Sequence, residues 1–174
     1  MTHTREQLLA RLDELGIVHT TFEHPPVYTV EEARQHTAHL PGGHCKSLFL
    51  KDKKERLWLL VCLDRRRIDM SRLARAIGSA RLSFGRPERL EAVLGIAPGA
   101  VTPFALINDR AHQVQPLLDR AMLEYAQLNY HPLTNAATTT IAARDLVRFI
   151  EACGHEPRVI DLDSTGVDTA GSGA

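Results

Sequence analysis

The sequence has no long hydrophobic run. Its longest uninterrupted apolar stretch is Leu57–Leu63, far shorter than the about 20 apolar residues that a membrane-spanning helix needs. The first residues, MTHTREQ, lack the apolar centre of a secretory signal. We therefore expect a cytoplasmic protein.

Cysteine is scarce, and its spacing excludes two kinds of site. The chain has 3 cysteines, at positions 45, 62 and 153, an odd number with no C-x-x-C pair. Such a set suggests neither a disulfide framework nor a zinc knuckle. We interpret all three as free thiols.

Several catalytic motifs are also missing. The chain contains no G-x-S-x-G elbow, no P-loop, no G-x-G-x-x-G turn and no H-E-x-x-H helix, which argues against the enzyme classes built on them. His36, His39, His44 and Cys45 could together hold a metal, but no second cluster with ligand spacing supports this. We expect no metal and no cofactor, and stoichiometric zinc in the purified protein would contradict that expectation.

Net charge is absent overall but present locally. The formal net charge is +0, yet from Lys46 to Leu90 we count 13 Lys and Arg against 5 Asp and Glu, a local excess of 8. Each basic run alone, KDKKER or DRRR, reads most simply as a solvated turn. Their combination in one segment favours a basic face that can approach a phosphate backbone.

The length of 174 residues suits one domain with one well-formed core. Capping boxes at Thr4 and Thr29, an Asp69 cap and a first-turn Pro87 predict helices from 4 to 15, from 29, from 69 to 77 and from 87. A last helix is expected over 142–153, and strands over 19–23, 47–50, 57–63, 104–107, 114–118, two within 128–141, and 158–162. Pro116 would suit an edge strand. We assign 1–163 to the domain and 164–174, which offers nothing to bury, to a disordered tail.

Three short features could belong to a site. Lys46 stands at the head of an apolar strand, where the simplest interpretation is a lysine that extends its charge to solvent. The loop from Gly99 to Pro103 could point backbone N–H groups at a carbonyl oxygen. His131 precedes Pro132 and is biased to extended backbone. Taken singly, each feature is more often purely structural.

Together, the stretches HPPVYTVEEA, GGHCKSLFLKDKK, APGAVTPFALIND and NYHPLTNAATTTI resemble the YbaK and prolyl-tRNA synthetase insertion-domain family of editing deacylases, from about Thr4 to Leu162. Two fingerprints of that family, a lysine opening a core strand and a G-x-x-x-P loop, stand here as Lys46 and 99–103. The resemblance implies an α+β fold: a single domain with a mixed, mostly antiparallel sheet and peripheral helices.

The resemblance also implies an activity, trans editing. The substrate would be tRNA(Pro) carrying a wrong amino acid. The resemblance implies that this amino acid is alanine, because a synthetase pocket built for proline cannot strongly reject a smaller apolar residue. The synthetase or an elongation factor would be a transient partner. No protein nucleophile is expected, since in this family the substrate's 2′-hydroxyl is thought to assist the attacking water.

The family likeness assigns roles to residues. Lys46 would hold the phosphate or ribose of the terminal adenosine, Gly99 would orient the acyl group and stabilise the oxyanion, and His131 would shape the pocket or position water. The remaining substrate-binding candidates are Ala100, Val101, Thr102, Pro103, Val18, Val27, Tyr28 and Asn135. The candidates for docking the tRNA acceptor stem are Lys51, Lys53, Lys54, Arg65, Arg66 and Arg67.

Three alternatives stay open. A related enzyme could remove cysteine, serine or threonine instead, because pocket volume decides this. A noncatalytic module could bind tRNA and leave its ester intact. A covalent route through Cys45 is also conceivable, since a neighbouring cation can lower a thiol pKa; however, alternate strand residues face opposite sides, so we expect Cys45 and Lys46 not to share a cleft.

Overall fold

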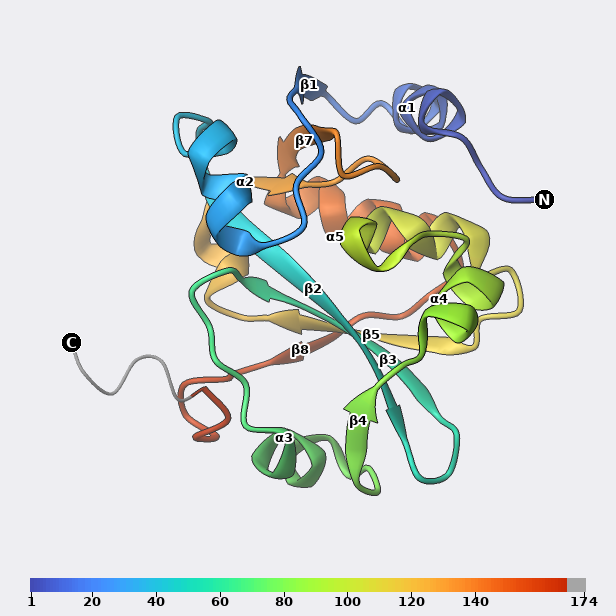
Figure 1. The fold of residues 1–174 in the computed structure, drawn as a ribbon, viewed down its shortest axis with the longest axis vertical. Coiled ribbons are helices and arrows are strands. Elements are labelled where there is room, and N and C mark those ends of the chain that lie inside the picture. Colours follow the sequence, from blue (N-terminus) through green and yellow to red (C-terminus); the bar gives the residue numbers. More distant parts are fainter. Residues whose placement is uncertain (169–174) are drawn as a thin grey trace.

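A computed structural model describes residues 1–168. Its strands form one 8-stranded sheet in the order β1-β7-β6-β2-β3-β5-β8, with β4 paired to β2 (Figure 1). The strands are β1 (His19–Glu23), β2 (Gly43–Asp52), β3 (Leu57–Leu63), β4 (Leu82–Phe84), β5 (Val114–Asp119), β6 (Gln127–Tyr130), β7 (Ala137–Ala142) and β8 (Arg158–Ile160). Four of the seven strand pairs are antiparallel. The sheet is therefore mixed and mostly antiparallel, as predicted.

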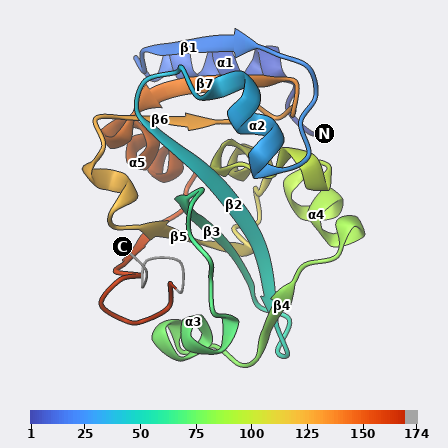
Figure 2. The same ribbon diagram turned by 60° about the vertical axis from the view of Figure 1, so that its left-hand side comes forward.

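Strand β2 joins the two halves of this sheet. Its first residues, Gly43 and His44, pair in parallel with β6, whereas Cys45–Lys51 pair antiparallel with β3. The strand thus parts from β6 just before Lys46. Figure 2 shows β2 running from β6 and β7 at one end to β4 at the other.

Helices α1 to α4 begin where the capping signals predict, and α1, α3 and α4 also end beside the predicted glycines. They are α1 (Arg5–Glu14), α2 (Val30–Thr37), α3 (Met70–Ile77), α4 (Pro87–Leu94) and α5 (Ala143–Ala152). Thr4 makes the predicted reciprocal capping box with Gln7, and Asp69 caps α3. At α2 the Thr29 hydroxyl accepts from the Glu32 N–H, but the Glu32 carboxylate accepts from the N–H of Tyr28. Among the described residues, no helix is long and apolar enough to cross a membrane.

Two apolar clusters cover the two faces of the central strands. Every residue of β3 is buried, and its side chains alternate: Leu57, Leu59 and Val61 join the larger cluster, while Trp58 and Leu60 join the smaller one. Burial of each such side chain contributes about 1.5–3 kcal/mol to folding. These two clusters hold β2 and β3 rigidly in place, and with them the site at their ends.

Two strand predictions differ from the structure. The predicted strand over 104–107 is wrong, because Pro103–Asn108 form a 3-10 helix in which the Thr102 hydroxyl accepts from the Phe104 N–H. This segment is apolar and mostly buried, so its pattern could not separate strand from helix. The expectation that Pro116 marks an edge is also wrong, since β5 lies between β3 and β8. Pairing with β8 starts only at Leu117.

The predicted disordered tail begins too early. Val167 is 0% exposed, and the Asp168 carboxylate accepts from the buried guanidinium of Arg66. Val167 and Asp168 therefore pack on the domain. The remainder of the predicted tail lies outside the described residues.

Candidate active site

A pocket of about 170 Å³ opens where β2 parts from β6. Figure 2 shows α2 lying across this end of β2. The wall includes three predicted catalytic residues, Lys46, Gly99 and His131, so the fold brings together groups that are far apart in sequence. The rest of the wall is Val27, Tyr28, Thr29, Val30, Ala33, Arg34, Thr37, His44, Cys45, Ser47, Asp64, Pro98, Val101, Asn129, Tyr130 and Thr138.

The Lys46 ammonium is anchored to the turn after β3. Its Nζ donates to the backbone carbonyl of Arg66. The Arg66 side chain is buried and pairs with Asp119 at 2.9 Å, with Asp163 at 2.5 Å and with Asp168. The hydrogen bond to Asp163 is the largest cause of the raised pKa of Arg66, and the same bond lowers the pKa of Asp163. A buried ion cluster thus fixes the carbonyl that holds Lys46.

The rim beside Lys46 carries a neutralised pair. Arg34 donates to both carboxylate oxygens of Asp64 at 3.1 and 3.2 Å, and this contact raises the pKa of Arg34. The Asp64 N–H donates to the carbonyl of His44 at 2.9 Å, which ties the turn to β2. Within residues 1–168 Lys46 forms no salt bridge, so it supplies an uncompensated positive charge to the pocket.

Gly99 brings backbone close to the pocket. A Cβ built on it would lie 3.2 Å from the Asn135 Nδ2 and 3.2 Å from the Tyr28 Cδ1. The loop therefore approaches both neighbours as closely as only glycine allows without displacing them. Val101 also lines the pocket.

The other predicted loop residues support the wall from behind. Ala100, Thr102 and Pro103 are buried outside the pocket lining. The Thr102 hydroxyl accepts a hydrogen bond from the Phe104 N–H at the N-terminus of the 3-10 helix. Their assignment as substrate contacts is thus not supported by their positions, since all three are buried and only Val101, which lies between them in the chain, lines the pocket.

His131 presents one ring nitrogen to the pocket. Its Nδ1 lies 3.1 Å from the carbonyl oxygen of Ala137, and because a carbonyl only accepts, Nδ1 carries the proton. In the described part of the chain, Nε2 has no hydrogen-bond partner. Burial lowers the pKa of His131. The ring is therefore neutral near pH 7, with a lone pair on Nε2 for a water or an amine.

A second histidine, His24, contacts the pocket through Thr138. Its Nδ1 lies 2.8 Å from the carbonyl of Pro25, and its Nε2 lies 2.9 Å from the Thr138 Oγ1. The same tautomer argument makes Thr138 the donor to His24 when the ring is neutral. Sequence reasoning missed this pair. Three consecutive threonines in an otherwise apolar strand, 138–140, were the available signal, because a buried polar side chain is a more informative observation than a buried apolar one.

Cys45 is an unreactive neighbour. Burial raises the pKa of its thiol to about 12, so it is protonated near pH 7. The Cys45 Sγ donates to the Gly43 carbonyl at 3.6 Å and packs with the larger cluster, whereas Lys46 reaches the opposite side of the strand toward Arg66. The expectation of opposite faces is confirmed. The expectation that they share no cleft is wrong, because the pocket spans the strand end and both residues line it.

The four weaker candidates separate into three positions. Val27 and Tyr28 line the pocket. Asn135 lies outside the lining and donates to the Val27 carbonyl at 2.9 Å, so it supports the wall. Val18 is 82% exposed between α1 and β1 and takes no part in the pocket, so its assignment is wrong.

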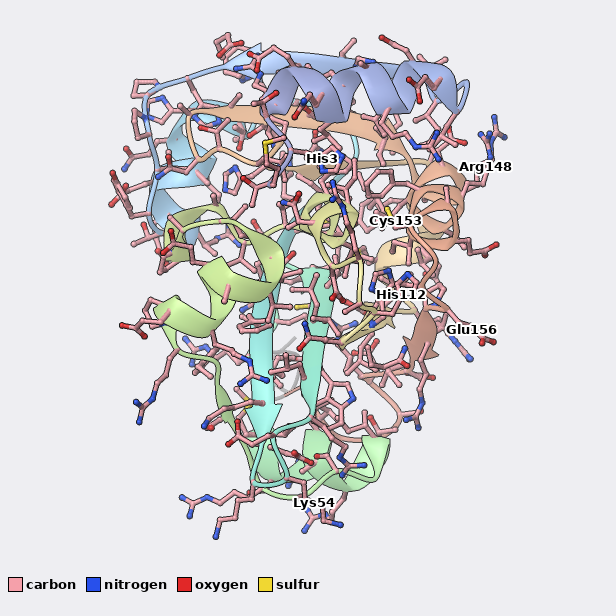
Figure 3. The ribbon with its side chains drawn as sticks, turned by 90° about the vertical axis from the view of Figure 1, so that its right-hand side faces the viewer. His3, Lys54, His112, Arg148, Cys153 and Glu156 are labelled. Atoms are coloured by element: carbon pink, nitrogen blue, oxygen red, sulfur yellow. The ribbon has the colours of Figure 1, made fainter. Side chains whose placement is uncertain are left out.

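The predicted basic docking residues are scattered. Lys53 and Lys54 lie at the turn between β2 and β3 and Lys51 just before it, and at about 3.3 Å per residue Lys53 is over roughly 20 Å along β2 from Lys46. Figure 3 shows Lys54 at the end of the molecule opposite α1. Arg65 and Arg67 are exposed near the pocket. The assignment of Arg66 to RNA contact is wrong, because its side chain is 0% exposed and ion-paired.

Two of the histidines considered above as metal ligands make ring contacts instead. His36 stacks on His24 with centroids 6.0 Å apart, and His39 lies edge-on to Phe22 at 4.8 Å. His44 lines the pocket. In residues 1–168, no group of three or more His, Cys, Asp or Glu side chains is arranged to hold a metal.

The chain is similar in sequence and in fold to known proteins. Residues 24–149 match the model of the aminoacyl-tRNA editing domain. The chain is 42% identical over 164 residues to the prolyl-tRNA synthetase associated domain-containing protein 1 of Xenopus laevis, covering 91% of this chain and 97% of that protein. It is 36% identical over 159 residues to the prolyl-tRNA editing protein ProX of Acetoanaerobium sticklandii, covering 91% and 97%. A solved structure proposed to be a trans-editing enzyme for prolyl tRNA synthetase superposes with a TM-score of 0.70 at 22% identity, covering 92% and 97%.

Proposed function

Because the chain belongs to the aminoacyl-tRNA editing domain family, we propose that it hydrolyses the ester between tRNA(Pro) and a wrongly attached amino acid, and that this amino acid is alanine. The observation that carries the proposal is the pocket itself. It gathers an anchored ammonium (Lys46), an approachable backbone turn (Gly99) and an imidazole with a free lone pair (His131) around one small space.

Each group has a task in ester hydrolysis. The Lys46 ammonium binds the terminal phosphate or ribose and holds the ester beside the pocket, which removes much of the entropy cost of reaction. The Gly99 turn lies against the acyl group and stabilises negative charge on its carbonyl oxygen. The His131 Nε2 accepts a hydrogen bond from the attacking water or the substrate amine. Water adds to the carbonyl carbon, the ester C–O bond breaks, and the ribose oxygen takes a proton.

The size of the pocket suits a small aminoacyl group. Sites for drug-sized ligands occupy about 300–1,000 Å³, whereas this pocket has about 170 Å³. A proline synthetase distinguishes a missing methylene by only about 1–3 kcal/mol. A second site that admits the small residue and excludes the larger one then supplies the missing discrimination.

The route needs no protein nucleophile, since the Cys45 thiol stays protonated. The His24–Thr138 hydrogen bond, however, has the arrangement of a base and a hydroxyl nucleophile, so a covalent route through Thr138 is the competing mechanism. Replacing Thr138 separates the two, as described in the Discussion.

The experiment is deacylation of tRNA(Pro) charged separately with alanine, cysteine, serine or proline. We expect fast loss of alanine, slow loss of proline, and a collapse of the rate in Lys46→Ala. Arg110→Ala is the control, because it removes an exposed charge that neither lines the pocket nor belongs to the predicted docking residues. If tRNA binds and every ester survives, the protein is a binding module. Selective loss of cysteine or serine would reassign the substrate within the family.

Transient partners follow from the same proposal. The protein acts on tRNA(Pro) after the synthetase releases it, so the synthetase or an elongation factor would compete for, or hand over, the charged tRNA. Pull-down with charged and uncharged tRNA(Pro) tests this, and equal recovery of these partners without tRNA would argue against a handover.

A further inference from the structure

One exposed aromatic ring stands at the pocket. Among residues 1–168 three aromatic side chains are strongly exposed: Tyr28 at 73%, Phe84 at 61% and Tyr125 at 44%. Tyr28 is the member of this set that lines the pocket. Its neighbour Val27 is only 2% exposed, so the chain buries one residue and directs the next, an aromatic ring, to solvent.

The backbone that carries this ring is held firmly. The Val27 N–H donates to the Asn135 carbonyl at 3.0 Å, and the Asn135 side chain donates back to the Val27 carbonyl at 2.9 Å. The Tyr28 N–H donates to the Glu32 carboxylate at 3.0 Å. Because the backbone is fixed on both sides, little freedom remains to be lost when a ligand contacts the ring.

The ring lies beside the turn that faces the acyl group. Its Cδ1 is 3.2 Å from the position of a Cβ on Gly99, so the edge of the ring packs on the Gly99 backbone. An ester held at Gly99 belongs to a ribose, and the base of that ribose must project from the mouth of the pocket. The exposed ring of Tyr28 is at that mouth.

From this arrangement we propose that Tyr28 is a stacking surface for the base of the terminal adenosine of the tRNA. The inference rests on the proposed function, because it takes the substrate to be an aminoacyl adenosine. Aromatic side chains bind unpaired bases through their faces without reading sequence. Stacking would fix the ribose relative to Lys46 and Gly99, so Tyr28 is a binding residue that orients the ester rather than a participant in bond breaking.

The test measures binding without catalysis. The probe is an acceptor-stem RNA hairpin ending in an alanyl amide, which the enzyme cannot hydrolyse as an ester. We expect Tyr28→Ala to raise its Kd roughly 5- to 150-fold, the value of one stacked base, and to raise KM for the ester more than it lowers kcat. Tyr28→Phe keeps the ring and stays near wild type. Phe84→Ala, which removes an exposed ring from β4, leaves Kd unchanged.

A second probe, the same hairpin with an abasic terminal residue, isolates the base. Wild type should bind it weakly, and Tyr28→Ala should weaken it no further. An equal loss with normal and abasic probes overturns the inference, as does a Tyr28→Phe variant as weak as Tyr28→Ala, which would assign the role to the hydroxyl. Wild-type protein that binds the amide but hydrolyses no ester refutes the proposed function alone.

Discussion

Replacing Arg66 by methionine should destabilise the protein strongly and in a pH-dependent way. The substitution removes the guanidinium that pairs with two buried carboxylates, Asp119 at 0% and Asp168 at 1% side-chain exposure. Removing one partner from a buried pair costs about 3–5 kcal/mol. Asp119 keeps backbone donors at Leu63 and Ala121, at 3.2 and 3.1 Å, so about 4 kcal/mol is the expected loss. For a chain of this length that lowers Tm by roughly 8–16 °C.

The direction of the pH effect follows from the ion cluster. Arg66 lowers the pKa of Asp163 in the folded protein, so this stabilisation is complete above the unfolded pKa of about 3.9 and is lost as pH falls through the lower folded value. In Arg66→Met, Asp163 loses the guanidinium that lowers its pKa. The stability gap between variant and wild type should therefore be nearly constant from pH 7 down to about pH 4 and should shrink as the pH falls further.

The assay is urea unfolding followed by circular dichroism at pH 7 and at about pH 3, below the unfolded pKa of Asp163. Arg65→Met is the matched control, because Arg65 is the neighbouring residue, its side chain is 52% exposed, and it lies 4.0 Å from Asp168; it should cost at most about 1 kcal/mol. A loss below about 1 kcal/mol for Arg66→Met at pH 7, or a loss equal at both pH values, would refute the reasoning. Because the Arg66 carbonyl holds Lys46, deacylation by the surviving folded fraction should also fall.

Four further outcomes test the site. Cys45→Ser should retain most activity, because the buried thiol is protonated; a loss as large as in Lys46→Ala would demand a covalent route. Thr138→Val should lower kcat only several-fold if water attacks directly, whereas abolition with an acyl-enzyme trapped by mass spectrometry would establish the nucleophile. The kcat profile should be flat above the lowered pKa of His131 and should fall below it, since protonation removes the Nε2 lone pair; His131→Asn should lose that acid limb. Gly99→Ala should lower kcat/KM clearly while leaving Tm nearly unchanged, because the added Cβ displaces groups 3.2 Å away beside the pocket without entering the core.

Local signals predicted the elements well where the cause is local. Side-chain caps at Thr4 and Asp69, and left-handed glycines at Gly78 and Gly95, act within one helical turn, so residue type and spacing are enough to place helix ends. The same reasoning gave a wrong prediction for the segment after Thr102. Its apolar residues are buried on all sides, and burial removes the periodicity that distinguishes strand from helix.

The site was predictable in part. Lys46, Gly99 and His131 come from stretches whose resemblance to a known family is visible in the sequence, and the fold brings them to one pocket. The prediction that Arg66 contacts RNA, which was based on charge alone, is wrong because a DRRR run does not show which arginine side chain is buried. That choice depends on Asp119 and on the C-terminal segment, which are distant in sequence.

The sequence by itself determined most helix boundaries, the central hairpin and the family, because capping, alternation and motif order are properties of neighbouring residues. Tertiary structure alone decided which polar groups meet. Parallel pairing of β2 with β6 ends at His44, and the strands separate there to open the pocket. The buried partners of Arg66, the His24–Thr138 bond and the exposed ring of Tyr28 all arise from contacts between distant segments, for which spacing along the chain carries no information.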